Sequence, residues 1–223
     1  MSSVKIHKKS TDTDMTPFVD IAFLILSFFI MATKFKPPEP ISITTPNSVS
    51  SQDLPENDAV LITIDSTNRV FFSVLSEKNK AIFDQVIQKL NTLRTLNLTN
   101  AQMANFKKTI AVGVPFASLG SLLDVPSDEQ GKVAQPGIPV LDTLDNQLVW
   151  WISASKEVFR DNQRPLKYLI KGDGGSKYPA FEAVMAALKK NDEYKYNLVT
   201  SLENAPPNSA LDVANRRGKS GGK

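Results

Sequence analysis

The chain has 223 residues, of which 41% are hydrophobic and 22% are charged. This composition is typical of a globular protein and too polar for a protein with many membrane spans. There is no cysteine and one histidine, His7, which excludes disulfides, thiol nucleophiles, and a catalytic triad or multi-histidine zinc site in the main body. The net charge of +3 comes from residues 205–223, which hold four basic side chains and one acid. The sequence lacks the stripe of clustered basic residues that is typical of proteins that bind nucleic acid.

Residues 15–35 are the most apolar stretch and are predicted to be a single membrane-spanning helix. The run up to Thr33 has 19 residues, which as a helix would be about 28 Å long, close to the ~30 Å hydrocarbon core of a bilayer. Thr16 can cap this helix, and Pro17 suits the first turn, where its missing N–H costs nothing. Lysines in the arm at residues 1–14 favour a cytoplasmic N-terminus, which leaves the C-terminal part outside.

A secretory signal peptide is the alternative interpretation of this stretch. Lysines precede the apolar core, and the small residue Ala32 lies near a position where cleavage could occur. That interpretation gives a soluble periplasmic binding protein. Against it, Asp20 interrupts the apolar region, and the flank at residues 34–36 fits the end of a spanning helix better than a cleavage motif.

Asp20 is the residue of this helix that suggests chemistry. An ionised carboxylate near the centre of a bilayer costs at least about 2.5 kcal/mol, so such residues are usually protonated, paired or facing an aqueous path. The structural alternative is that Asp20 lies only one turn from the helix start, where the macrodipole and interfacial water ease its ionisation. The physics of the residue alone leaves both interpretations open.

The stretch from Asp14 to Asp20, Asp-Met-Thr-Pro-Phe-Val-Asp followed by an apolar run, resembles the start of the ExbD and TolR family of proton-channel subunits. The resemblance implies that Asp20 carries protons and that Thr16 and Pro17 support the proton site. It also implies the partners, which are a multi-span ExbB-like ring, a second copy of this chain in a homodimer, and a TonB-like protein. No cofactor is expected.

Residues 36–57 are predicted to be an extended periplasmic linker. The segment holds five prolines, which disfavour helix and favour a semi-rigid tether. Residues 41–45 alternate apolar and polar side chains, so Ile41 and Ile43 could belong to an edge strand that pairs with the domain or with a second copy. Docking and release of this strand would act as a linker switch. A solvated spacer is the alternative.

Residues 58–204 are predicted to be an α+β domain. Two runs rich in β-branched and aromatic residues, 60–64 and 70–72, flank turn residues and indicate a hairpin. The other expected elements are a helix over about 78–93, a strand over 166–171, a helix over 178–190 and a strand over 196–200. Helices would then cover one face of a small sheet. The stretches around Gly172, Tyr178 and Leu198 also resemble the periplasmic domain of the ExbD and TolR family.

An insertion at about 97–163 departs from the smallest members of that family and is expected to be rich in helix. Asn100 can cap a helix that ends near residue 108, and residues 116–123 form a short apolar piece. After a loop over 126–139, a third helical stripe is expected from Leu144, Leu148, Trp151, Val158 and Phe159. Of the adjacent tryptophans Trp150 and Trp151, one is expected in the core, unless the pair forms a docking surface for a partner.

Two further segments carry weaker signals. The glycine-rich residues 172–175 lack the lysine and the spacing of a nucleotide-binding loop, so they are predicted to be a plain turn. The basic end, residues 205–223, is predicted to be disordered. This tail could contact peptidoglycan or anionic headgroups.

The single span with Asp20, taken with the resemblance to the ExbD and TolR family, implies a proton-channel subunit of an inner-membrane ExbB–ExbD-type motor, which couples the proton motive force to TonB-dependent outer-membrane transport. Two alternatives share the same anchor and domain. One is a Tol-like motor subunit for envelope integrity, and the other is a membrane-tethered, peptidoglycan-binding scaffold without proton traffic. An enzyme or a metal protein is the least supported class, because no nucleophile–base pair or ligand cluster occurs in the exported part.

Overall fold

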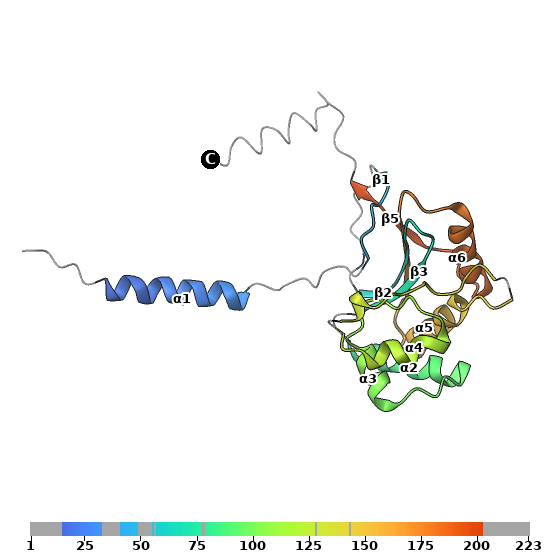
Figure 1. The fold of residues 1–223 in the computed structure, drawn as a ribbon, viewed down its shortest axis with the longest axis horizontal. Helices are drawn as coiled ribbons and strands as arrows, with labels where there is room; N and C mark the ends of the chain where they lie inside the picture. The colour runs from blue at the N-terminus through green and yellow to red at the C-terminus, as the bar shows by residue number, and fades with distance from the viewer. Residues whose placement is uncertain are drawn as a thin grey trace, which may run out of the picture. The chain divides into compact units, whose positions relative to one another are not determined.

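The computed structural model describes residues 15–32, 41–48, 55, 57–76, 79–127, 129–142 and 144–202. The predicted arm at 1–14 and the predicted tail at 205–223 lie outside the described residues, as does part of the linker. The chain divides into two compact units, Met1–Pro38 and Glu39–Lys223 (Figure 1).

The described part of the first unit is helix α1 (Thr16–Ala32). Pro17 is its second residue, in the first turn, where no backbone donor is required. Val19 N donates to Met15 O at 3.0 Å at the start of the helix. The predicted end at Phe35 lies outside the described residues. Within the part of the chain that the structure describes, no helix combines the length and the apolar character needed to cross a membrane.

The second unit is built on a four-stranded sheet with the strand order β3-β2-β4-β5. Its strands are β2 (Asn57–Ile64), β3 (Val70–Ser76), β4 (Lys167–Gly172) and β5 (Asn197–Val199). β2 and β3 form the predicted antiparallel hairpin, with Ile62 opposite Phe72, and β4 and β5 run parallel to β2. Because side chains alternate between the two faces of a strand, every second residue of β2 and β3 enters the core. These residues are Val60, Ile62, Ile64, Val70, Phe72 and Val74.

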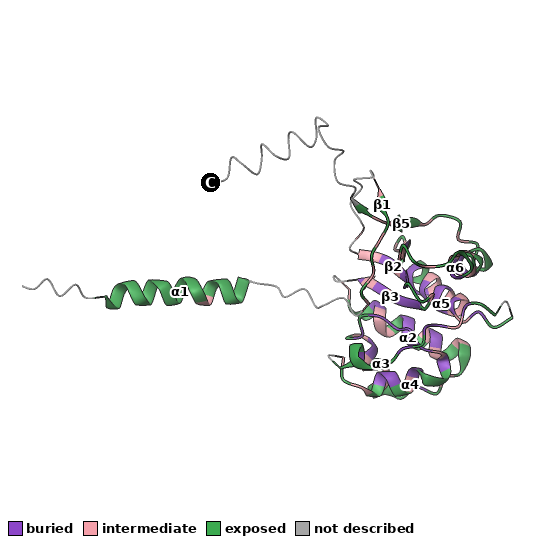
Figure 2. Ribbon diagram, turned by 45° about the horizontal axis from the view of Figure 1, so that its top comes forward, coloured by how far each residue is buried: buried purple, intermediate pink, exposed green. Residues whose placement is uncertain are grey.

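Three helices cover one face of this sheet (Figure 2): α2 (Ala81–Arg94), α5 (Leu148–Asp161) and α6 (Tyr178–Lys190). α5 contacts both α2 and α6. Their apolar stripes, such as Ile82, Val86 and Leu90 of α2, are fully buried in a core shared with the strands. The predicted α+β architecture, a small sheet with several helices, is therefore confirmed.

The insertion contributes α5 and three smaller elements, which are α3 (Asn100–Phe106), α4 (Phe116–Asp124) and the 3-10 helix η1 (Gln130–Lys132). The cap of α3 is Thr99 rather than the predicted Asn100. Thr99 Oγ1 accepts the Gln102 N–H at 3.2 Å, and Gln102 Oε1 accepts the Thr99 N–H at 2.9 Å. This reciprocal pair satisfies two backbone donors that a cap at Asn100 would leave unbonded.

Leu144 does not belong to the helix that its spacing predicts, because α5 begins only at Leu148. Asp142 Oδ1 accepts the Leu144 N–H at 2.9 Å, and Asn146 Oδ1 accepts the Leu148 N–H at 3.1 Å. Such bonds from short polar side chains compete with the helical ladder. They keep this stretch in a loop, where Leu144 is 95% exposed.

Two extended stretches of the insertion lie along the outer edge of β3. Phe72 and Val112 exchange backbone hydrogen bonds of 2.8 Å, and Ile138 N donates to Val70 O at 2.8 Å. The insertion therefore covers one of the two edges of the sheet. The interpretation of the tryptophan pair as one core residue and one partly exposed neighbour is confirmed, since Trp151 is fully buried and Trp150 is half-buried.

Candidate functional site

The polar residues of α1 lie on one face of the helix. Thr16, Asp20 and Ser27 are the polar side chains among its 17 residues. At about 100° of rotation per residue they fall within an arc of roughly 40°. The rest of the helix surface is apolar. α1 thus presents one face that can meet water or polar partner groups and a broad face suited to an apolar environment.

Each of the three predicted proton-site residues lies in the N-terminal third of α1. Thr16 is the first residue of the helix and Pro17 the second, while Asp20 follows one turn later. Thr16 precedes Asp20 by four positions and Pro17 precedes it by three, so both are its neighbours on the helix surface. Asp20 is exposed in the described structure.

Ser27 is the member of this polar face that the sequence analysis missed. It follows Asp20 by seven positions, which is close to two helical turns and returns to the same face. Its hydroxyl donates to Leu24 O at 2.9 Å. The seven-residue spacing was the available signal, and it is hidden when residues 15–35 are judged only by their average apolarity.

The predicted linker switch residues, Ile41 and Ile43, lie in the second unit. Both are half-buried, as is Thr45, while Ser42 and Thr44 between them are exposed. This alternation is the one expected of an extended segment against a surface. The paired strand itself lies further along the chain than the predicted 41–45. It is β1 (Asn47–Ser48), which runs parallel to β6 (Ser201–Leu202).

The linker segment is held by the glycine-rich turn after β4, chiefly by the side chain of Asp173. Asp173 Oδ2 accepts the Thr44 N–H at 2.9 Å, and Gly174 N donates to Thr44 O at 2.9 Å. The other carboxylate oxygen, Oδ1, accepts the Gly175 N–H at 2.8 Å. The turn thus binds the backbone of the linker at one residue, Thr44, whose N–H donates to the turn and whose carbonyl oxygen accepts from it.

A second set of bonds ties the linker to the end of the domain. Ser201 N donates to Pro46 O at 3.0 Å, and the hydroxyls of Thr45 and Ser201 are hydrogen-bonded to each other. The linker is therefore docked on two segments that are far from it in sequence, the turn at 173–175 and strand β6.

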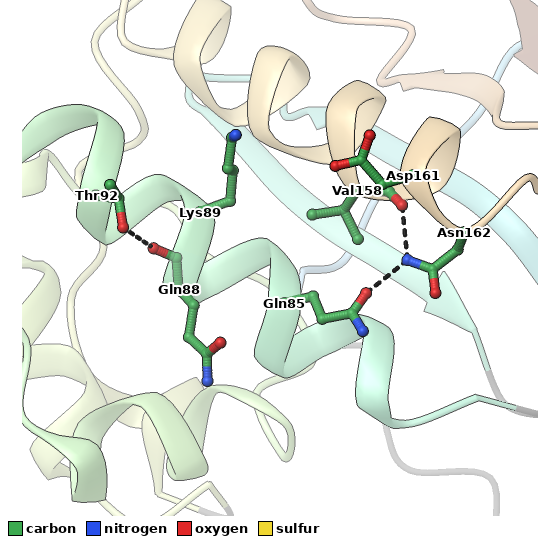
Figure 3. Close-up of a pocket in the computed structure, with 7 residues that line it drawn as sticks. All are labelled: Gln85, Gln88, Lys89, Thr92, Val158, Asp161 and Asn162. Carbon is green, nitrogen blue, oxygen red and sulfur yellow. Dashed lines mark hydrogen bonds between the residues drawn. The ribbon is translucent and has the colours of Figure 1, made fainter.

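One groove in the described part of the domain lies between α2 and α5 and has a volume of about 470 Å³. Figure 3 shows its lining of Gln85, Gln88, Lys89, Thr92, Val158, Asp161 and Asn162. Across the groove, Asn162 Nδ2 donates a hydrogen bond to Gln85 Oε1 at 2.6 Å. A smaller groove of about 390 Å³ lies beside α3 and α4. Neither lining pairs a nucleophile with a base, and no group of Asp, Glu and His among the described residues could hold a metal ion.

Among the residues that the structure describes, Asp65 and Tyr168 have shifted pKa values, and both lie in the domain. Burial alone would raise the pKa of Asp65, which is 4% exposed. Hydrogen bonds from the Arg69 backbone, Thr67 and the Arg69 guanidinium, together with the Arg69 charge, outweigh burial and lower the pKa. Burial, with a smaller contribution from the charge of Glu193, raises the pKa of Tyr168 above its usual range.

The described chain combines an apolar helix, whose single polar face includes a carboxylate, with a small α+β domain that binds its own linker. The family model of the biopolymer transport protein ExbD/TolR matches residues 7–203, which include helix α1, the linker and the insertion. The chain belongs to the ExbD/TolR family. No curated protein and no solved structure matches the chain.

Membership of this family establishes the general role. ExbD/TolR proteins are inner-membrane proteins with a periplasmic domain, and they are subunits of transport motors rather than enzymes. They work with partners of the ExbB or TolQ type and of the TonB or TolA type. The chain is accordingly an energising subunit of biopolymer transport.

Proposed function

We propose that this chain is the proton-channel subunit of an ExbB–ExbD-type motor, which couples the proton motive force to TonB-dependent outer-membrane transport. The observation that carries the proposal is the placement of Asp20 on the polar face of α1. A carboxylate on an otherwise apolar helix needs a partner or an aqueous path to offset its cost. Family membership supplies a motor in which such a path is required.

In this proposal α1 is the membrane anchor, with the N-terminus in the cytoplasm and the domain in the periplasm. The described helix α1 has 17 residues and is about 26 Å long, which is shorter than the ~30 Å hydrocarbon core. The proposal therefore uses the full predicted span of residues 15–35, whose end lies outside the described residues, together with the local thinning of bilayers around short helices. The lysines before the helix favour this orientation.

Asp20 would accept a proton from the periplasmic side and release it to the cytoplasm. A single helix offers no sheltered aqueous path, so the proposal requires a multi-span ExbB-like ring and a second copy of this chain inside it. Neutral Asp20 tolerates an apolar surface, whereas ionised Asp20 needs a polar one. Alternating protonation can therefore detach the helix from one partner group and attach it to the next.

The docked linker supports a second part of the proposal, the switch. With the linker bound to Asp173 and to β6, the tether between the two units is shortened by the docked residues. Release of the Thr44 and Ser201 bonds would lengthen the tether, and the two states would interconvert because the docking bonds are few. Ile41 and Ile43, which are half-buried in the docked state, would be exposed in the released one.

Two other functions make different predictions from the same anchor and domain. A Tol-like motor also needs Asp20 but serves envelope integrity, so loss of Asp20 would give detergent sensitivity with normal TonB-dependent uptake. A peptidoglycan-binding scaffold without proton traffic does not need Asp20 at all. Replacement of Asp20 therefore separates the scaffold from both motors, and the phenotype separates the motors from each other.

The experiment is an uptake and envelope assay in cells that carry Asp20→Asn in the full chain. We expect loss of TonB-dependent uptake, while the variant still co-purifies with its ExbB-type partner. Ala22→Asn is the matched control, because it places the same side chain in α1 on the face opposite to Asp20. Normal uptake in Asp20→Asn with normal assembly would overturn the proton-channel proposal and favour the scaffold.

A further inference from the structure

Ser27 extends the polar face of α1 past Asp20 toward the C-terminal end of the helix. The two residues differ by only about 20° around the helix axis and by roughly 10 Å along it. No other polar side chain lies between Asp20 and the end of α1 at Ala32. In the orientation proposed above, Ser27 lies on the periplasmic side of Asp20, from which protons would arrive.

The Ser27 hydroxyl has a defined hydrogen-bonding state. Its proton is donated to Leu24 O at 2.9 Å, one turn back along the same helix. A hydroxyl has one donor and two acceptor positions, so the oxygen of Ser27 remains able to accept hydrogen bonds. With its own proton engaged, Ser27 is oriented as an acceptor for a water molecule on the polar face.

The distance excludes direct transfer between the two side chains. Roughly 10 Å is several times the length of a hydrogen bond, which is about 3 Å between heavy atoms, so Asp20 and Ser27 can communicate only through intervening water. An apolar face of this length does not retain water unless polar groups bind it. Ser27 supplies such a group at the midpoint of the stretch from Asp20 to the helix end.

We infer that Ser27 is a positioning residue that holds the water through which protons reach Asp20. This inference rests on the proposed proton-channel function. The proton passes along hydrogen-bonded water and binds an Asp20 carboxylate oxygen, while Ser27 keeps its own proton and its bond to Leu24. Ser27 thus determines the rate of proton uptake, whereas Asp20 is the group that binds the proton.

A purely structural role for Ser27 makes a different prediction. A serine whose hydroxyl bonds only the backbone of its own helix has no part in proton transfer. Its replacement by alanine or valine would then leave transport unchanged. A small residue needed only for close packing against a partner helix would tolerate alanine and reject both valine and threonine. The two isosteres threonine and valine therefore separate a hydroxyl requirement from a size requirement.

The test is proton flux into proteoliposomes that contain the full chain with its ExbB-type partner, for Ser27→Ala, Ser27→Val and Ser27→Thr. We expect Ser27→Ala and Ser27→Val to reduce flux by about two- to tenfold, the effect of losing one hydrogen bond. Ser27→Thr, which keeps the hydroxyl at the volume of valine, should retain most of the flux. Equal co-purification of the partner with all three variants shows that assembly is unchanged.

The pH dependence of the reduced proton flux separates the two roles, because a purely structural role would give the same reduction at every pH. Because Ser27 acts on uptake, the deficit of Ser27→Val should increase as the pH on the uptake side rises and proton supply becomes limiting. The double variant Ser27→Ala with Ala22→Ser moves the hydroxyl to the opposite face and should not restore flux. Recovery in that double variant would overturn the inference.

Failure of the inference can be distinguished from failure of the proposed function. Asp20→Asn, measured in the same proteoliposomes, tests the function itself. If Asp20→Asn abolishes flux while Ser27→Val conducts normally at every pH, the inference about Ser27 is wrong and the function stands. If Asp20→Asn also conducts normally, both are wrong.

Discussion

The indole of Trp151 in α5 packs against the ring of Phe72 in β3, with ring centroids 4.8 Å apart. Trp151 belongs to the insertion, whereas Phe72 belongs to the hairpin that opens the domain. Phe106 of α3 and Phe116 of α4 complete the cluster, at 5.8 Å and 6.1 Å from the same indole. The insertion is therefore part of the hydrophobic core of the domain and not an appendage on its surface.

Truncation of this contact should destabilise the whole domain. We expect Trp151→Ala to lower the free energy of unfolding by about 3 to 5 kcal/mol, because a large aromatic side chain is replaced by a cavity. Trp150→Ala is the matched control. Trp150 is half-buried and stacks on the Arg94 guanidinium at 4.9 Å, so its loss should cost only about 1 kcal/mol. Urea denaturation of the full chain followed by circular dichroism measures both, and equal effects would contradict a core role for Trp151.

Gly113 allows the insertion to approach the sheet closely. A Cβ atom at this position would lie 2.1 Å from Cδ1 of Phe71, a residue that is 3% exposed. Gly113→Ala should therefore destabilise the domain by about 1 to 3 kcal/mol through overpacking. Gly131→Ala is the control, because a Cβ atom there has nothing within 4 Å. A Gly113→Ala variant as stable as Gly131→Ala would show that the Phe71 ring can move aside.

The Asp65 carboxylate at the β2–β3 turn should make the free energy of unfolding depend on pH in the acidic range. Its pKa in the folded chain is lowered, so its stabilising contribution is present above the ordinary carboxyl value of about 3.9 and is lost as pH falls through the lower folded value. Asp65→Asn should reduce stability at pH 7 by about 1.5 to 3 kcal/mol, the range for hydrogen bonds to a charged group. It should have less effect below pH 3.

Urea midpoints at a series of pH values measure this difference. Glu182→Gln, at an exposed position on α6, is the control and should leave the pH profile unchanged. A constant gap between wild type and Asp65→Asn from pH 7 to pH 2 would contradict the assigned role of Asp65.

The docked linker can be tested by crosslinking, because the native chain has no cysteine. The hydroxyls of Thr45 and Ser201 bond each other, so Thr45→Cys with Ser201→Cys should form a disulfide that fixes the docked state. Asp173→Ala, which removes the acceptor for Thr44, should reduce the yield of this disulfide. Asp173→Asn, which keeps an acceptor oxygen, should reduce it less.

The functional arm of this experiment addresses the switch. The oxidised double variant should lose transport and regain it on reduction, while each single cysteine variant should be unaffected by oxidant. Full transport by the oxidised, fully crosslinked chain would show that release of the linker is not needed.

The sequence is sufficient to predict elements whose apolar spacing agrees with a local capping or turn signal. The hairpin of β2 and β3 and the helix α6, with Pro179 in its first turn, are in this group. The periodicity of Ile82, Val86 and Leu90 predicts α2 for the same reason. In each case the local preference and the final packing favour the same structure.

Features that depend on contacts between distant segments could not be predicted in this way. The strand β1 forms at Asn47–Ser48 because Ser201 and Leu202 lie beside it, and nothing near residue 47 indicates this. The role of Asp173 in docking Thr44 is likewise a property of two segments 129 residues apart. Leu144 fits a helical stripe by spacing, but Asp142 and Asn146 keep it in a loop.

The candidate proton site shows both cases within one helix. Asp20 could be identified because a carboxylate in an apolar run is costly and because the surrounding motif resembles a family. Ser27 has no motif of its own, and only its position relative to Asp20 on the helix surface makes it a candidate. Spacing within a predicted helix was thus more informative than its average composition.

The central claim is that Asp20 must bind and release a proton, and proton flux through the reconstituted complex of the full chain and its ExbB-type partner tests it most directly. Asn has the size and hydrogen bonding of Asp but cannot carry a proton, whereas Glu keeps the carboxyl group on a side chain one methylene longer. The account predicts that Asp20→Asn reduces flux to the level of empty vesicles, and that Asp20→Glu retains a measurable part of it. Wild-type flux in Asp20→Asn, in a complex of normal composition, would contradict the account.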